Sequence, residues 1–140
     1  MARALPDEVA SLIRDEQARQ AGRFIAHPDL AAYLAKLAER AELLIDSAEG
    51  RCRGLVAYYC NDLETRQAFI TLVVVDPRDR STGLGKALVG CVLAIARQRG
   101  FTSCRLEVAK DNQAAYELYS RQGFRVVEDR PHNHLLEIAL

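Results

Sequence analysis

The sequence predicts one domain of the α/β (α+β) class over residues 1–140, built on a mixed, mostly antiparallel sheet. Three observations support this prediction. A chain of 140 residues is long enough to bury one hydrophobic core. Short β-branched, apolar segments alternate with longer segments in which apolar residues recur at helical spacing. At residues 67–88 an apolar strand, a glycine loop and a helix follow one another directly, an order that favours a parallel crossover.

Two helices are expected in residues 1–40. Residues 6–21 place apolar side chains at helical spacing among charged ones, and Gly22 is a typical helix stop. A second helix should begin near Asp29, whose side chain can cap the first turn. We expect this pair both to cover the core and to form the acceptor side of a binding site.

Three strands are expected next, the first starting at residues 43–45 with its turn at 48–50, the others at 53–60 and 67–75. The turns between them are short, so the strands should form an antiparallel meander. Pro77 lacks a backbone N–H and should end the third strand. Strand alternation predicts two faces for that strand, one with Phe69, Thr71 and Val73 and the other with Ile70, Leu72 and Val74.

The remaining elements alternate between helix and strand. A helix is expected from residue 83 or 84 to about 99, followed by a strand at 102–108 that lies parallel to the central strand. A second helix, capped by Asp111 or Asn112, should end at residue 123, and strands at 124–127 and 135–140 should pair. One face of the first of these helices is expected to carry Leu84, Leu88, Cys91 and Ile95.

The composition of the chain narrows the range of partners and sites to expect. Nineteen basic residues balance nineteen acidic ones, which gives no electrostatic case for nucleic acid or an anionic membrane as partner. No apolar run approaches the ~20 residues that span a bilayer, and the acidic N-terminus does not resemble a signal peptide, so a cytoplasmic location is expected. The four cysteines are far apart without a Cys-x-x-Cys pair, so we expect buried, reduced thiols and no metal site.

The glycine loop after the central strand is a candidate phosphate site, because backbone N–H groups and the helix dipole both favour an anion there. A Walker-type loop is excluded, since Arg80 stands where its first glycine belongs and Ala87 follows Lys86 without a hydroxyl. A dinucleotide fingerprint is incomplete, because Leu88 stands where its third glycine belongs. A third pattern, Val-x-Pro-x-x-Arg-x-x-Gly-x-Gly, is matched throughout by Val75, Pro77, Arg80, Gly83 and Gly85.

A second pattern, Asn-x-x-Ala-x-x-Leu-Tyr-x-x-x-Gly-Phe, begins 27 positions after Gly85, counting from 85 to 112. It is matched by Asn112, Ala115, Leu118, Tyr119, Gly123 and Phe124. With both patterns in this order, residues 43–128 resemble the GNAT superfamily of acyl-CoA N-acyltransferases. The first 40 residues carry no motif of that family.

The resemblance implies acetyl-CoA, or a close acyl-CoA, as cosubstrate, with no metal. It implies helices on both faces of a sheet that splays between the central strand and the next parallel strand, often at a bulge. The pantetheine arm would enter that gap beside the strand, and the pyrophosphate would lie on the loop amides. Asn112 would contact the pantetheine or order the crevice, the alternative being simple helix capping. The implied cofactor-binding residues are Leu72, Val73, Val75, Arg80, Ser81, Thr82, Gly83, Leu84, Gly85, Lys86 and Asn112.

Amine acylation needs a neutral amine, a donor for the carbonyl oxygen and a proton for the leaving thiolate. We assign the donor for the carbonyl oxygen to a strand amide around Val73. We assign the proton for the thiolate to Tyr119. With ordinary pKa values of ~10 for tyrosine and ~8.5 for a thiol, that proton transfer is uphill by roughly 2 kcal/mol. The alternative for Tyr119 is that it only packs.

The general base is not identified by the sequence. Many relatives place a glutamate on the central strand, but no carboxylate stands in the middle of this one. Other candidates are two turn carboxylates, three histidines and water relayed by a tyrosine or threonine. They are Asp62, Glu64, His27, His132, His134, Tyr58, Tyr59 and Thr71.

The predicted function is an acetyl-CoA-dependent N-acetyltransferase acting on a primary amine. The acceptor can be an amino sugar, an amino acid, a polyamine or a protein amine. One alternative is a non-catalytic acyl-CoA sensor or interaction module on the same scaffold, and another is a nucleotide-binding regulator. Acyl-chain preference and oligomeric state, including a homodimer, stay open.

Overall fold

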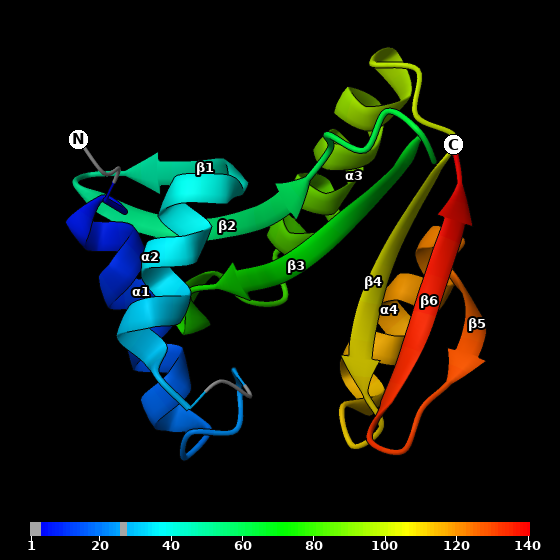
Figure 1. Ribbon diagram of the computed structural model, residues 1–140. Helices are drawn as coiled ribbons and strands as arrows, with labels where there is room; N and C mark the ends of the chain where they lie inside the picture. The colour runs from blue at the N-terminus through cyan, green and yellow to red at the C-terminus, as the bar shows by residue number, and fades with distance from the viewer. Residues whose placement is uncertain (1–3, 26–27) are drawn as a thin grey trace.

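Six strands form one sheet in the order β1-β2-β3-β4-β6-β5 in the computed structural model, which describes residues 4–25 and 28–140 (Figure 1). The strands are β1 (Glu42–Ala48), β2 (Arg51–Tyr59), β3 (Gln67–Val75), β4 (Ser103–Ala109), β5 (Arg125–Asp129) and β6 (Asn133–Ala139). The helices are α1 (Asp7–Arg19), α2 (Leu30–Arg40), α3 (Leu84–Gln98) and α4 (Gln113–Gln122), with one 3₁₀ turn, η1 (Pro77–Asp79).

The strand pairings confirm the predicted topology. β1, β2 and β3 form the antiparallel meander, and β3 begins and ends at the predicted residues 67 and 75. β4 lies parallel to β3 after the α3 crossover. β6 pairs antiparallel with both β4 and β5, so the closing strand pair joins the sheet through β6.

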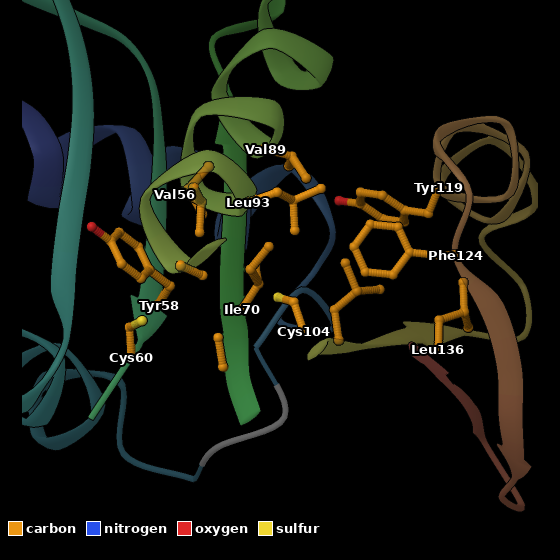
Figure 2. Close-up of a cluster of buried hydrophobic side chains, with 14 of the residues drawn as sticks. Val56, Tyr58, Cys60, Ile70, Val89, Leu93, Cys104, Tyr119, Phe124 and Leu136 are labelled. Carbon is orange, nitrogen blue, oxygen red and sulfur yellow. The ribbon is translucent and has the colours of Figure 1, made fainter. Parts of the chain in front are cut away.

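Helices cover both faces of the sheet, as expected. α1 and α2 pack on one face through a cluster that contains Val9, Ile13, Leu34 and Leu37 with Leu55, Ala57, Leu72 and Val74 of the strands. α3 and α4 pack on the other through a cluster that contains Val89, Val92, Tyr119 and Phe124 with Val56, Ile70, Leu106 and Leu136 (Figure 2). The N-terminal helix pair therefore does cover the core.

The alternation of β3 breaks at Thr71. Opposite β2, Ala57 pairs with Leu72 and Tyr58 with Ile70, which leaves Thr71 as an extra residue in a β-bulge. The prediction that Ile70 and Leu72 share a face is therefore wrong, because Ile70 packs with α3 and α4 whereas Leu72 packs with α1 and α2.

The sheet opens at the same place. β3 pairs with β4 only from residue 67 to Ile70, which lies opposite Leu106. Beyond this pair the two strands diverge, and Figure 1 shows the gap widening between them. The bulge rotates the second half of β3, and residues 71–75 have no strand partner on the β4 side.

Two details of burial differ from the predictions. The buried stripe of α3 consists of Leu88, Val89, Val92, Leu93 and Ala96. Cys91 is exposed, so its assignment to the apolar face and to the buried thiols is wrong. The other three cysteines are buried and free.

The described residues supply no group of side chains arranged to hold a metal ion. Within the same residues, no helix combines the length and hydropathy needed to cross a bilayer. The expected cytoplasmic location stays a prediction.

Candidate active site

A cavity of about 590 Å³ lies where β3 and β4 separate. Its walls come from the middle of β3, the end of β4, the start of α4 and the end of α1. They are formed by Ile70, Thr71, Leu72, Val73, Leu106, Glu107, Val108, Ala109, Asp111, Asn112, Ala115, Tyr119, Arg19, Gln20, Arg23 and Phe24. The structure thus brings four predicted site residues together, namely Leu72, Val73, Asn112 and Tyr119. Val75 and residues 80–86 are not part of the wall and follow it along the chain.

The backbone of β3 offers hydrogen-bonding groups to this cavity. Asp76 N donates to Arg53 O at 2.8 Å, which continues the ladder with β2 by one residue. Since N–H directions alternate along a strand, the amides of Leu72 and Val74 point toward β2. The amide of Val73 therefore points toward the open edge, where a ligand can reach it.

The loop that follows β3 is anchored by ion pairs. Asp76 accepts hydrogen bonds from the Arg78 backbone N–H at 2.9 Å and from the Arg78 guanidinium at 3.0 and 3.1 Å. These bonds hold the pKa of Asp76 well below its usual range. Asp79 is bound by Arg51 at 2.7 Å and by Arg53 at 3.3 Å. The base of the loop is therefore fixed to β2.

The rest of the loop presents backbone donors. Ser81 and Gly83 both adopt left-handed conformations, with φ of 65° and 84°. The first helical bond runs from Ala87 N to Gly83 O, so the amides of residues 84–86 have no acceptor within α3. No residue in the described ranges accepts from these three amides. Free amides at the start of a 15-residue helix suit an anion such as a diphosphate.

The side chain of Arg80 is held by acceptors on α1 and β3. Its guanidinium donates to Glu16 of α1 at 2.5 Å and to the Val75 carbonyl at 3.2 Å. Lys86 is exposed, and its carbonyl accepts from Gln122 Nε2 at 3.2 Å, which joins the end of α4 to the start of α3.

Tyr119 contributes a buried phenol to the cavity wall. Its side chain meets Phe124 edge to face, with ring centroids 5.8 Å apart, and Figure 2 shows the hydroxyl directed toward the α3 side of the cluster. Burial raises the pKa of Tyr119 to about 12. No hydrogen bond joins this hydroxyl to a described residue, although buried phenols usually have one. An unpaired donor in the wall of a cavity is therefore available to a ligand.

Asn112 has a clear structural role. Its Oδ1 accepts from Ala115 N at 3.1 Å and caps α4. The residue also lines the cavity.

Most candidates for the general base lie away from the cavity wall. Asp62 accepts from the backbone N–H groups of Glu64 and Thr65, in the turn before β3. His132 and His134 belong to the β5–β6 connection and β6, and neither lines the cavity. His27 lies outside the described residues.

Among the relay candidates, the structure favours Thr71. Tyr58 is buried in the α3 and α4 cluster, and Tyr59 packs against the α1 and α2 cluster. Thr71 lines the cavity at the bulge. Burial raises the pKa of Tyr33, while a hydrogen bond with Thr71 partly offsets this rise, so a phenol from α2 also reaches the bulge.

Sequence reasoning missed Tyr33, which reaches the bulge through its hydrogen bond with Thr71 but was hidden among the apolar positions of its helix. The wall residues Arg19, Arg23 and Phe24 were also missed, because they carry no motif. Glu107 lies on β4 beyond the point of separation, where its carboxylate accepts from Arg130 at 2.8 Å and from Asn133 at 3.3 Å.

Comparison with known proteins gives one family match. The model of the acetyltransferase (GNAT) family matches residues 9–124, which is most of the chain. An uncharacterized N-acetyltransferase of Methanocaldococcus jannaschii is 37% identical over 83 residues, covering 56% of this chain and 37% of that protein. Mycothiol acetyltransferase of Clavibacter michiganensis is 36% identical over 83 residues, covering 59% and 26%. The chain thus spans well under half the length of these curated relatives.

A solved structure extends the comparison to the whole fold. The PaiA N-acetyltransferase of Thermoplasma acidophilum, crystallised with coenzyme A, superposes with a TM-score of 0.68. It is 19% identical, and the match covers 97% of this chain and 80% of that one. At this identity the likeness concerns the fold alone.

Proposed function

Because the chain belongs to the acetyltransferase (GNAT) family, we propose that it transfers the acetyl group of acetyl-CoA to a primary amine by direct attack. One observation carries this proposal. The opened edge of β3 at residues 71–73 and Tyr119, whose hydroxyl forms no hydrogen bond with a described residue, line one cavity, and the free amides of residues 84–86 follow along the chain. Along the chain the opened edge of β3 comes before the free amides, which is the order of pantetheine arm and diphosphate in acetyl-CoA.

The cofactor is expected to run along the second half of β3. Its diphosphate lies on the amides of residues 80–86, where the helix dipole adds to the hydrogen bonds. Its pantetheine arm pairs with the backbone at residues 72–75 in the manner of an added strand. Asn112 contributes its side-chain amide from the opposite wall. The coenzyme A in the PaiA structure supports this cofactor class.

Two groups of the protein, the Val73 amide and the Tyr119 hydroxyl, act on the reacting atoms as the substrate amine attacks. The Val73 amide donates to the carbonyl oxygen as negative charge develops there. The amine attacks the carbonyl carbon, the carbon–sulfur bond breaks, and Tyr119 gives its proton to the departing thiolate. With the pKa of Tyr119 raised to about 12, that transfer is uphill by about 5 kcal/mol from a thiol value of ~8.5. The Tyr119 hydroxyl therefore stays protonated at neutral pH and donates as sulfur gains charge.

The amine must lose a proton before or during attack, since a primary alkyl amine has a pKa near ~10.4. We assign this step to water bound at the Thr71–Tyr33 pair, because the pair lies at the bulge beside the acyl position. Glu107 also lines the cavity, but Arg130 and Asn133 already occupy its oxygens.

Release of free thiol from acetyl-CoA tests the proposal. The assay uses amino sugars, amino acids, polyamines, and peptides with a free N-terminus or lysine. At least one amine should accelerate thiol release, and the Tyr119→Phe variant should lose most of that acceleration.

A non-catalytic acyl-CoA sensor is the second candidate, because no carboxylate stands on β3 to serve as base. A sensor would bind acetyl-CoA in a titration and release no thiol with any amine. That outcome would contradict the enzymatic proposal.

A further inference from the structure

Glu16 of α1 is a buried charge with several partners. The residue is 5% exposed. Its carboxylate accepts from Arg19 at 2.9 and 3.1 Å, from Gln20 at 2.7 Å and from Arg80 at 2.5 Å. Burial raises the pKa of Glu16, but the hydrogen bonds from Gln20 and Arg19 and the charge of Arg80 outweigh burial and leave the pKa below its usual range. The carboxylate is therefore ionised at neutral pH, as a buried acid with such partners should be.

The partners of Glu16 belong to two different parts of the candidate site. Arg80 begins the loop that carries the free amides, and its Nε also donates to the carbonyl of Val75 at the end of β3. Arg19 and Gln20 line the cavity on the wall formed by the end of α1. One oxygen, Glu16 Oε1, accepts from both arginines. Glu16 and Arg80 are 64 positions apart in the sequence, so this contact links distant segments of the chain.

We propose that Glu16 is a positioning residue that holds the cofactor loop in its binding conformation by fixing the guanidinium of Arg80 against α1 and the end of β3. This inference rests on the proposed function. The loop contains a left-handed non-glycine residue, Ser81, so its conformation needs support from its neighbours. With Arg80 held, the amides are preorganised and the cofactor does not have to order them on binding.

The Glu16→Gln variant tests this role, because glutamine keeps the size of the side chain and removes its charge. Acetyl-CoA should bind about tenfold more weakly in a calorimetric titration, with a matching rise in its KM, while kcat at saturation changes by less than about threefold. This split is expected because Glu16 acts on the loop and not on the reacting atoms. Asp15→Asn is the matched control, an exposed neighbour on the same helix, and should bind acetyl-CoA like the wild type.

A double-mutant cycle with Arg80→Gln shows whether Glu16 acts through Arg80. The double variant should bind acetyl-CoA no more weakly than the weaker single variant, because both changes remove one interaction. Wild-type binding by Glu16→Gln, or additive losses in the double variant, would overturn the proposal.

Arg80→Lys keeps the test valid if Glu16→Gln does not fold. Lysine preserves the positive charge at the loop. Its ammonium group lacks the separate Nε and terminal nitrogens with which the guanidinium donates to the Val75 carbonyl and to Glu16. It should weaken acetyl-CoA binding several-fold, and wild-type affinity in this variant would contradict the proposal. A wild-type protein that binds no acetyl-CoA would instead contradict the proposed function itself.

Discussion

At the level of single residues, the proposed chemistry depends on the hydroxyl of Tyr119. Tyr119 lines the cavity, forms no side-chain hydrogen bond with a described residue, and has a pKa raised to about 12 by burial. A group with a raised pKa keeps its proton until the pH approaches that value. Turnover should therefore show no loss from ionisation of Tyr119 between about pH 8 and 10.

Replacing Tyr119 with phenylalanine should lower kcat about 100-fold, the usual scale for loss of a general acid. The affinity for acetyl-CoA should stay within about twofold, because the ring and its packing on Phe124 are preserved. Steady-state kinetics and a binding titration give the two quantities. Tyr116→Phe is the matched control on the same helix, since that ring packs against His134, 5.7 Å between centroids. An unchanged kcat in Tyr119→Phe would remove the phenol from the mechanism.

Two substitutions at Asn112 separate its capping role from a ligand role. Asn112→Ala should reduce the free energy of unfolding by about 1 kcal/mol, because the cap of α4 is lost. Asn112→Ser should keep most of that stability, since serine also caps helices, but it lacks the side-chain amide. Both variants should weaken acetyl-CoA binding several-fold if the amide contacts the pantetheine. Wild-type affinity in Asn112→Ser would restrict Asn112 to capping.

At the level of helices and strands, one glycine before α3 and one inside it allow a paired test of the loop conformation. Gly83 precedes the helix with φ of 84°, whereas Gly90 is exposed in its interior with open space where a Cβ would stand. Gly83→Ala should cost about 1 kcal/mol of stability and weaken acetyl-CoA binding, because alanine disfavours the left-handed conformation that shapes the loop.

Gly90→Ala should instead stabilise the protein by roughly 0.5–1 kcal/mol and leave acetyl-CoA binding unchanged. Urea unfolding and a binding titration distinguish the two variants. Equal effects of the two substitutions on acetyl-CoA affinity would argue against a special role for the loop conformation.

The central elements could be predicted because their boundaries carry local signals. Pro77 ends β3, Gly83 precedes α3, and Asp29 and Asn112 cap their helices through side-chain oxygens. These signals act within a few residues, so one sequence is enough to show them.

The position of the bulge at Thr71 and the buried face of α3 could not be predicted for a physical reason. In β3 the residues on both sides of Thr71 are apolar, so a shift of one position produces no mismatch between polarity and burial. In α3 the apolar residues surround most of the helix, so two different stripes suit the core equally well.

Part of the candidate site was predicted, because the two motifs pointed to a family. The resemblance implied roles for Leu72, Val73, Asn112 and Tyr119, and the structure brings these four residues to one cavity. Glu107, Tyr33 and the wall at the end of α1 come together through tertiary packing, which leaves no local pattern in the sequence.

For the whole molecule, acid stability should depend on the carboxylates that anchor the loop and the first helix. Hydrogen bonds and charge from arginines lower the pKa values of Asp76 and Asp79, and the partners of Glu16 outweigh its burial. A depressed pKa contributes stability above the unfolded value of about 4, and this contribution is lost as the pH falls through the folded value. Urea unfolding midpoints should therefore drop steadily below about pH 4.

The Asp76→Asn variant should show a smaller drop in this range, because it carries one fewer group with a depressed pKa. Its unfolding free energy at pH 7 should be about 1 kcal/mol lower, since the ionic hydrogen bonds with Arg78 are lost. A pH dependence equal to that of the wild type would show that Asp76 is not a major source of the acid sensitivity.

A crystal structure of the protein with coenzyme A tests the central claim most directly. We predict that the diphosphate accepts hydrogen bonds from the amides of the loop at residues 80–86, that the pantetheine lies against β3 beyond the Thr71 bulge, and that the sulfur lies beside the hydroxyl of Tyr119. A diphosphate bound elsewhere, or a Tyr119 hydroxyl turned away from the sulfur, would contradict the account.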